Sequence, residues 1–402
     1  MKPKRQKRLF WFEIALSSAD NFNQHTRSKQ HGLICGDLLR ESQAMKSISS
    51  DSIGKLHLES ILGRSLQTQG SQDPSNRKIS RMSKSSDLTV LSSALEISNL
   101  YHLEPYLRNV IPSRHSNLIQ IRITSFVCME SVQIVLIPIT LLHISKSAFQ
   151  YSGLRNIIFS RNPRINCLES YSFANCDELS SIVFPKMNSK LKIGESAFSH
   201  CSKLSKIQIP SLRKLSDSVF SSSGLQLVNL PQDSTLKKIG LKAFQDCSIL
   251  RSIQIPSSVL ELGEHCFHSS GLKSITFSPK SKLKKISNHA FENCSNLRSI
   301  EIPSSVEELG MSSFHSCDLR TIVIPHDSNL KKIGVSAFAS CINLRSIELP
   351  SSVETLGGYC FKHSGLISIC FSPKSKLKKI SPHMFERCVD LKSIEIPSSV
   401  EE

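Results

Sequence analysis

Residues 297–319 read LRSIEIPSSVEELGMSSFHSCDL, and this stretch contains one full unit of a repeat. Ile300 and Ile302 alternate with polar residues, which is typical of a half-buried strand. Pro303 cannot donate a sheet hydrogen bond, so the strand is expected to end there, and Ser304 and Ser305 favour a turn. The first third of the unit is therefore predicted to be a strand followed by a turn.

The remainder of the unit is predicted to fold back and begin again. Val306 and Leu309 supply a second set of inward residues, and Gly310 supplies a flexible corner. Residues 313–317 are predicted to form a short helical or 3₁₀ turn that carries Phe314 inward. Leu319 then starts the next strand, so one unit is one coil.

Phenylalanine marks this coil along the chain at a spacing of 22 to 25 residues. The ladder consists of Phe149, Phe173, Phe198, Phe220, Phe244, Phe267, Phe291, Phe314, Phe338, Phe361 and Phe385. From Phe244 onward, steps of 23 and 24 residues alternate, so two unlike coils make a 47-residue unit. Residues 271–308 and 365–402 differ at 8 of 38 positions, which leaves 30 identities and indicates duplication.

Stacking must supply the stability of such coils. A buried apolar side chain contributes roughly 1.5–3 kcal/mol, whereas fixing each residue costs about 1–2 kcal/mol of backbone entropy, so one coil alone should not fold. Stacked coils form a continuous core and pair their strands in parallel. We predict an α/β repeat solenoid: a curved leucine-rich repeat array with a parallel β-sheet on the concave face and short helical or 3₁₀ turns opposite.

The pattern Leu-x-x-Ile-x-Ile-Pro-Ser-Ser-Val-x-x-Leu-Gly-x-x-x-Phe-x-x-Cys-x-Leu resembles the BspA-like leucine-rich repeat family, over residues 130–402. The resemblance implies a curved solenoid and, in bacteria and parasitic protists, surface adhesion and binding of host proteins. It implies no active site.

Three regions are expected. Residues 1–105 are rich in polar and basic side chains and are predicted to be largely disordered. Residues 106–130 are predicted to be a degenerate N-terminal capping region, and residues 131–402 a leucine-rich repeat solenoid of about eleven coils. The last six residues, 397–402, fall within a coil, so we expect the array to be cut in mid-repeat.

The location of the protein is left open between two alternatives. Residues 1–12 are basic and then apolar like a secretory signal, but Glu13 interrupts the apolar run. The family resemblance implies the cell surface, whereas the broken signal and the cysteine usage favour the cytoplasm. No stretch is apolar for the ~18 residues that a membrane helix needs.

Most cysteines are predicted to be structural. Seven lie three residues after a ladder Phe, where serine stands in four other coils: Cys176, Cys201, Cys247, Cys294, Cys317, Cys341 and Cys388. A small inward side chain explains both residue types. His265, His268, Cys266, Cys360 and His363 lie near two ladder residues, but no Cys-x-x-Cys pair accompanies them. We therefore predict no metal, no cofactor and no catalytic residue, and the protein is not expected to be an enzyme.

The strand residues that point outward on the concave sheet are the candidate partner-binding site. They are Arg251, Gln254, Lys273, Arg298, Glu301, Arg320, Arg345, Glu348, Lys392 and Glu395. The alternative is that they only keep an exposed sheet soluble and pair across strands. The leading hypothesis is a surface-antigen or adhesin-like binding protein whose partner is a protein; the alternative is an intracellular scaffold.

Lysine-rich loops before the ladder Phe are a second candidate site. They contain Lys280, Lys282, Lys284, Lys285, Lys374, Lys376, Lys378 and Lys379. With a formal net charge of +17 they could attract polyanions. No aromatic residues interleave with them, so nucleic acid is not the expected partner, and a solvated loop is the alternative reading.

Overall fold

The computed structural model describes residues 87–90, 95–97, 100, 107–112, 116–184 and 191–401. Most of the predicted disordered segment, residues 1–105, lies outside these ranges. Strands β1 to β4 precede residue 131, and they pair in parallel with strands of the coils that follow.

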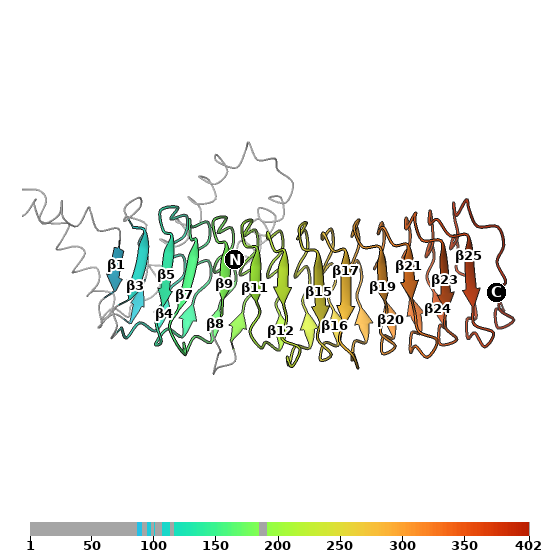
Figure 1. Ribbon diagram of the computed structural model, residues 1–402, viewed down its shortest axis with the longest axis horizontal. Helices are drawn as coiled ribbons and strands as arrows, with labels where there is room; N and C mark the ends of the chain where they lie inside the picture. Colours follow the sequence, from blue (N-terminus) through green and yellow to red (C-terminus); the bar gives the residue numbers. More distant parts are fainter. Residues whose placement is uncertain are drawn as a thin grey trace, which may run out of the picture. The chain divides into compact units, whose positions relative to one another are not determined.

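Each coil contributes one longer strand to one side of the solenoid. These are the odd-numbered strands β1 (Asp87–Val90), β3 (Asn109–Pro112), β5 (Ile134–Ile137), β7 (Asn156–Phe159), β9 (Ser181–Val183), β11 (Lys206–Gln208), β13 (Leu227–Asn229), β15 (Ser252–Ile255), β17 (Ser274–Phe277), β19 (Ser299–Glu301), β21 (Thr321–Val323), β23 (Ser346–Leu349) and β25 (Ser368–Phe371). Strands β1 to β17 form one parallel sheet, and β19–β21 and β23–β25 form two further pairs (Figure 1).

A two-residue strand from each coil forms the second side. The even-numbered strands are β2 (Glu96–Ile97), β4 (Gln120–Ile121), β6 (His143–Ile144), β8 (Cys167–Leu168), β10 (Lys192–Ile193), β12 (Lys214–Leu215), β14 (Lys238–Ile239), β16 (Glu261–Leu262), β18 (Lys285–Ile286), β20 (Glu308–Leu309), β22 (Lys332–Ile333) and β24 (Thr355–Leu356). They pair in parallel in two sheets, β2 to β10 and β12 to β24. The parallel repeat solenoid predicted from the sequence is therefore confirmed.

The ladder phenylalanines fill the core as a continuous stack. Successive rings lie 4.7–5.8 Å apart with interplanar angles of 3–19°. Phe126, which the sequence analysis did not include, stacks on Phe149 and begins the ladder one coil earlier. Because every ring is shared between two coils, the core belongs to neighbouring pairs and not to single coils.

The predicted helical or 3₁₀ turn at the phenylalanine is not found: the described residues contain no helix. In the coil of Phe291, the N–H groups of His289, Phe291 and Asn293 donate to carbonyls of the next coil at 2.8–2.9 Å. His289 and Asn293 both have positive φ, 56° and 59°. These N–H groups point along the array, so they cannot make the bonds within one segment that a helix requires.

Gly310 serves a different purpose from the flexible corner that was predicted. Among the described residues no glycine has a positive φ. A Cβ on Gly310 would lie 2.5 Å from the backbone nitrogen of Asn288 in the preceding coil. Glycine is needed because the two backbones approach so closely.

The inward position of the cysteine column is confirmed. The thiol of each of the seven cysteines donates to the carbonyl of a ladder Phe one coil earlier, at 2.9–3.2 Å. Where serine replaces cysteine, as at Ser152 and Ser270, its hydroxyl lies 3.4 Å from the next thiol. Burial raises the pKa of Cys176, Cys247 and Cys341 to about 12, so these thiols are protonated at neutral pH.

Candidate partner-binding surface

The sheet face is the side of the odd-numbered strands that points away from the core. Strand alternation places every second residue there, and the parallel register aligns equivalent residues of successive coils into columns. Ser252 pairs with Ser274 and Gln254 with Thr276. Equivalent positions of β19 and β21, and of β23 and β25, pair in the same register. All ten predicted partner-binding residues are exposed.

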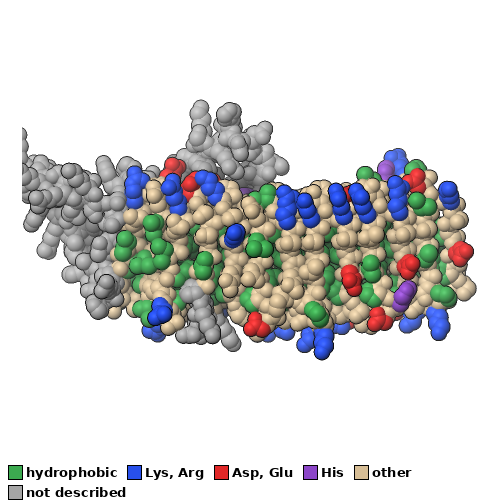
Figure 2. All heavy atoms as spheres, viewed as in Figure 1, with side chains coloured by type: hydrophobic (Ala, Val, Ile, Leu, Met, Phe, Trp, Pro, Cys, Tyr) green, Lys and Arg blue, Asp and Glu red, His purple; other side chains and the backbone are tan. Residues whose placement is uncertain are grey.

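A basic column runs along one edge of the sheet face. Its members directly precede their strands: Arg251, Lys273, Arg298, Arg320 and Arg345. The backbone N–H of Lys273 donates to the Arg251 carbonyl at 2.8 Å, which holds adjacent members in register. Figure 2 shows this row of Lys and Arg side chains. Ile367 interrupts the column, and Lys392 and Glu395 follow β25 outside any described strand.

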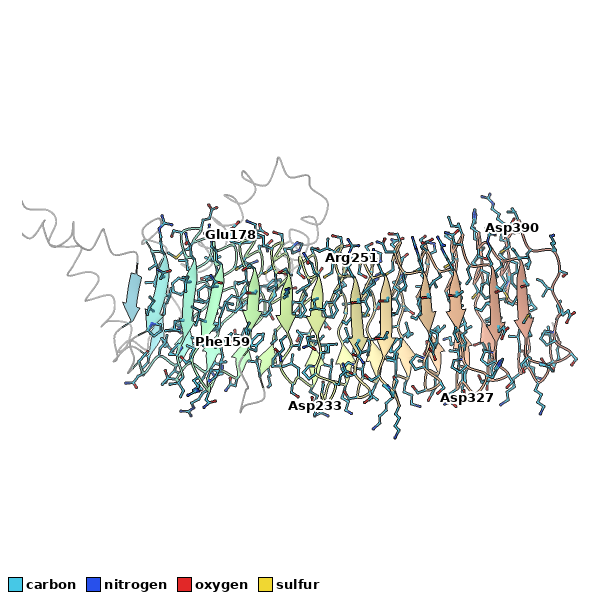
Figure 3. All side chains as sticks on the ribbon, viewed as in Figure 1. Phe159, Glu178, Asp233, Arg251, Asp327 and Asp390 are labelled. Atoms are coloured by element: carbon cyan, nitrogen blue, oxygen red, sulfur yellow. The ribbon has the colours of Figure 1, made fainter. Side chains whose placement is uncertain are left out.

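Acidic side chains at the same edge neutralise only part of the basic column. Glu178, Arg251 and Asp390 lie along this edge, opposite Asp233 and Asp327 (Figure 3). Arg345 Nη1 lies 2.6 Å from Asp390 Oδ2 and Arg298 Nε 3.5 Å from Asp318 Oδ2. Both arginine side chains are more than half exposed, so each pair contributes only about 0–1 kcal/mol.

Three members of the basic column have no salt-bridge partner in the part of the chain that the structure describes. They are Arg251, Lys273 and Arg320. The glutamates among the predicted residues do not form a continuous column, because Glu301 pairs in register with Val323 and Glu348 with Cys370. The sheet face therefore carries unneutralised cations beside hydroxyl and isolated carboxylate groups.

An apolar strip on the N-terminal part of the sheet face was missed by the sequence analysis. Ile111, Leu136, Ile158 and Val183 occupy the column that Gln208 continues. Val183 is 68% exposed and Ile158 48% exposed. The signal was present in the runs Ile134–Ile137 and Ile157–Phe159, where polar and apolar residues fail to alternate.

The lysine loops adjoin the other edge of the coils, and acidic residues of the next coil pair with part of them. Lys284 Nζ lies 2.6 Å from Glu307 Oε1, and Lys378 repeats this contact with Glu401 at 2.8 Å. Lys285 Nζ lies 3.2 Å from Glu308 Oε2. These contacts support the reading of a solvated, paired loop for three of the eight predicted polyanion-binding lysines.

A hollow brings the two predicted sites together at the end of β17. It is lined by Thr276, Pro279 and Lys280 on one coil and by Glu301 and Pro303 on the next. Lys280 belongs to the lysine loop and Glu301 to the sheet face, so a single ligand could contact both.

Comparison with known proteins places the repeat in a family. The model for the BspA type leucine rich repeat region matches residues 119–235, 213–329 and 326–402. The chain belongs to the BspA-type leucine-rich repeat family. The match begins at residue 119, before the start at 131 predicted from the sequence. No curated protein matches the chain significantly.

A solved structure shares the fold of this BspA-type array. A leucine-rich repeat protein from Bacteroides ovatus aligns with a TM-score of 0.58 and 24% identity, over 78% of this chain and 88% of that one. A leucine rich cell surface protein from Faecalibacterium prausnitzii aligns with a TM-score of 0.43 and 21% identity, over 77% and 87%. The first comparison shows a common fold and no more.

The BspA-type array has no membrane-spanning helix among its described residues. Its coils consist of strands and turns in the ranges given above, so every described element belongs to the solenoid. The surface of these coils, and above all the sheet face, is where the array can meet other molecules.

Proposed function

We propose that this protein is a non-enzymatic array that binds a protein partner on its sheet face, as a surface antigen or adhesin. The observation that carries the proposal is the apolar strip of Ile111, Leu136, Ile158 and Val183. Ile111, Ile158 and Val183 are exposed and Leu136 is half-buried. Such a row of aliphatic side chains on a solvent-facing sheet is unfavourable unless something covers it, and such patches are typical of interaction sites.

The remainder of the sheet face suits the rim of an interface. Protein interfaces combine an apolar centre with polar groups at the edge. The apolar strip supplies the centre, and the cations of Arg251, Lys273 and Arg320 supply orientation toward an acidic partner. The hydrogen-bonded strands are ordered before binding, so little conformational entropy is lost on association.

Membership of the BspA-type family supports the same function. Repeat solenoids bind partners on extended faces, and the resemblance implies adhesion to host proteins. Covalent capture of the bound protein would identify the partner.

Site-specific photo-crosslinking tests the proposal. A photoreactive phenylalanine analogue placed at Val183 should capture a protein, whereas the same group at Val335, an exposed valine beyond β22, should not. Ile158→Lys should weaken the captured complex at least about tenfold, since truncating a central interface residue costs roughly 2 kcal/mol or more. Equal capture from both positions would contradict binding on the sheet face.

Surface labelling separates the adhesin from an intracellular scaffold, which the free cysteines of the coils favour. A non-permeant reagent applied to intact cells should label the protein if it is exported. Complete protection, with labelling after lysis, would instead support the scaffold.

Polyanion binding is a second candidate because Lys280, Lys282, Lys374 and Lys376 are exposed and have no salt bridge with the described residues. Heparin affinity should then fall steeply with salt. Replacing these four lysines by glutamine should abolish most of that salt dependence. A variant with unchanged retention on heparin would exclude the lysine loops as the site.

A further inference from the structure

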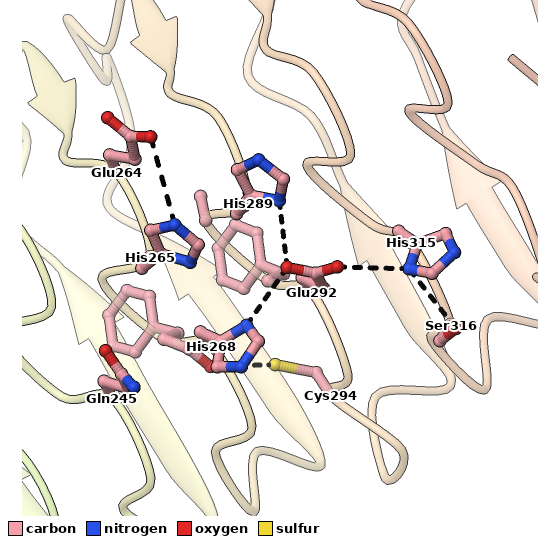
Figure 4. A network of polar contacts seen from close by, with 12 residues as sticks. Gln245, Glu264, His265, His268, His289, Glu292, Cys294, His315 and Ser316 are labelled. Atoms are coloured by element: carbon pink, nitrogen blue, oxygen red, sulfur yellow. Dashed lines mark hydrogen bonds and ion pairs between the residues drawn. The ribbon is translucent and has the colours of Figure 1, made fainter. Parts of the chain in front are cut away.

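Histidine and glutamate side chains gather on the outer side of the phenylalanine turns in three neighbouring coils (Figure 4). They occupy the positions two before and one after a ladder Phe. His265 and His268 flank Phe267, His289 and Glu292 flank Phe291, and His315 follows Phe314. All five side chains are half-buried, between 17% and 33% exposed.

Glu292 lies at the centre of this histidine cluster. Its Oε2 lies 2.9 Å from His289 Nδ1 and 3.2 Å from His268 Nδ1, and its Oε1 lies 3.2 Å from His315 Nδ1. His265 stacks on His289 with ring centroids 4.6 Å apart. The ligand atoms of His265, His268 and Glu292 all lie within 4.8 Å of one another.

The solenoid itself produces this spacing. Neighbouring parallel strands lie about 4.7–4.9 Å apart, so equivalent side chains of adjacent coils are held at nearly the distance between two ligands of one metal ion. Zinc bonds of about 2.0–2.1 Å place tetrahedral ligand atoms roughly 3.3 Å apart. Small rotations of the side chains are enough to close the difference.

We propose that His265, His268, His289 and Glu292 bind a divalent transition-metal ion of the zinc class. Imidazole and carboxylate together suit zinc, cobalt and nickel, and this set comes from only two adjacent coils. His315 contacts the other oxygen of Glu292 and orients the carboxylate, as partners of metal ligands commonly do.

One observation indicates that contacts within the protein leave the cluster incomplete. His268 Nδ1 lies within ion-pair distance of Glu292 but is not aligned for a hydrogen bond, and it has no other hydrogen-bond partner among the described residues.

The duplicated coils contain a natural variant of the cluster. Two units later, Tyr359 stands in the position of His265 and Lys362 in that of His268, while His383 and Glu386 match His289 and Glu292. Lys362 Nζ lies 3.0 Å from Glu386 Oε1, and Tyr359 stacks on His383 at 4.9 Å. The Lys362 ammonium group therefore takes the place of the metal ion that we propose beside Glu292. The coils fold with either set of side chains.

Titration of zinc into the metal-free full chain, in competition with a chromogenic chelator, tests the proposal. The variant His265→Tyr/His268→Lys copies the second arrangement, so it should fold and should bind zinc at least about tenfold more weakly. His326→Ala, which removes a histidine that is 90% exposed, is the matched control and should bind like the unmodified chain. Cobalt in the unmodified chain should give the visible absorption of a tetrahedral site.

The reverse variant, Tyr359→His/Lys362→His, should add a second zinc ion. Equal zinc affinity in the unmodified chain and in His265→Tyr/His268→Lys would overturn the proposal, as would an octahedral cobalt spectrum. Failure of the reverse variant to gain an ion would overturn it as well. None of these readouts requires a protein partner, so the result is independent of the sheet face.

Discussion

Single residues in the core of this array act between coils. Phe291 is fully buried and stacks on Phe267 and Phe314 at 5.4 and 5.2 Å. Its backbone N–H donates to Ser313 of the next coil. The side chain therefore fills space that two neighbouring coils share, and no other side chain can move in without disturbing the stack.

We expect Phe291→Ala to lower the free energy of unfolding by about 3–5 kcal/mol, because it leaves a cavity in the stack. Urea denaturation followed by circular dichroism measures the change. Arg298→Ala is the control: its side chain is 66% exposed, so the loss should stay below about 1 kcal/mol. A loss of that small size for Phe291→Ala would contradict the structural role of the ladder.

Thiol reactivity should separate the buried cysteines from the surface. Cys370 is exposed, whereas Cys176, Cys247 and Cys341 are buried with pKa values raised to about 12. Alkylation at pH 8, read site by site by mass spectrometry, should modify Cys370 within minutes and the other three only after unfolding. Rapid modification of Cys247 in the folded chain would show that its coil opens.

At the scale of elements, opposite charges alternate along the even-numbered strands. Glu261, Lys285, Glu308 and Lys332 follow one another in register on β16, β18, β20 and β22. The register brings the lysine-rich coil beside the coil rich in glutamate, and the 47-residue duplication repeats the arrangement. Much of the lysine pattern is thereby explained by pairing within the array.

The hydrogen bond from Lys284 lowers the pKa of Glu307 below its ordinary value of 4.5. A lowered pKa means that the pair stabilises the fold above pH 4.5 and that this contribution disappears as the pH falls through the lowered value. Lys284→Gln should raise the pKa of Glu307, as measured by NMR titration. Lys280→Gln, which removes a lysine without a described salt bridge, should leave it unchanged.

At the scale of the whole array, stability should spread by contact between neighbours. Most neighbouring coils are hydrogen-bonded to each other through both of their strands, and the phenylalanine turns are also bonded to those of the next coil. A defect should therefore loosen adjacent coils first.

Hydrogen exchange of Phe291→Ala should show this gradient. Amides near Phe267 and Phe314 should exchange much faster than in the unmodified chain, whereas those near Phe149 should change little. Uniform acceleration along the array would instead show that all coils unfold as one unit.

The sequence by itself determined the repeat, its period, its strands and its inward residues, because each depends on a pattern within one coil. Ile300, Ile302, Phe314 and Cys317 could be assigned to the core from spacing alone, and all four are buried. The candidate residues of the sheet face could also be named, since strand alternation decides which side they occupy.

Only the tertiary structure decided what happens between coils. The predicted helical turn is replaced by bonds to the next coil, and Gly310 is required by a backbone that lies 22 residues away in the chain. The apolar strip and the histidine cluster each combine residues of several coils, which become neighbours only through the stacking register. A sequence pattern does not show the distances between residues of different coils. Those distances bring together the residues of the apolar strip and of the histidine cluster.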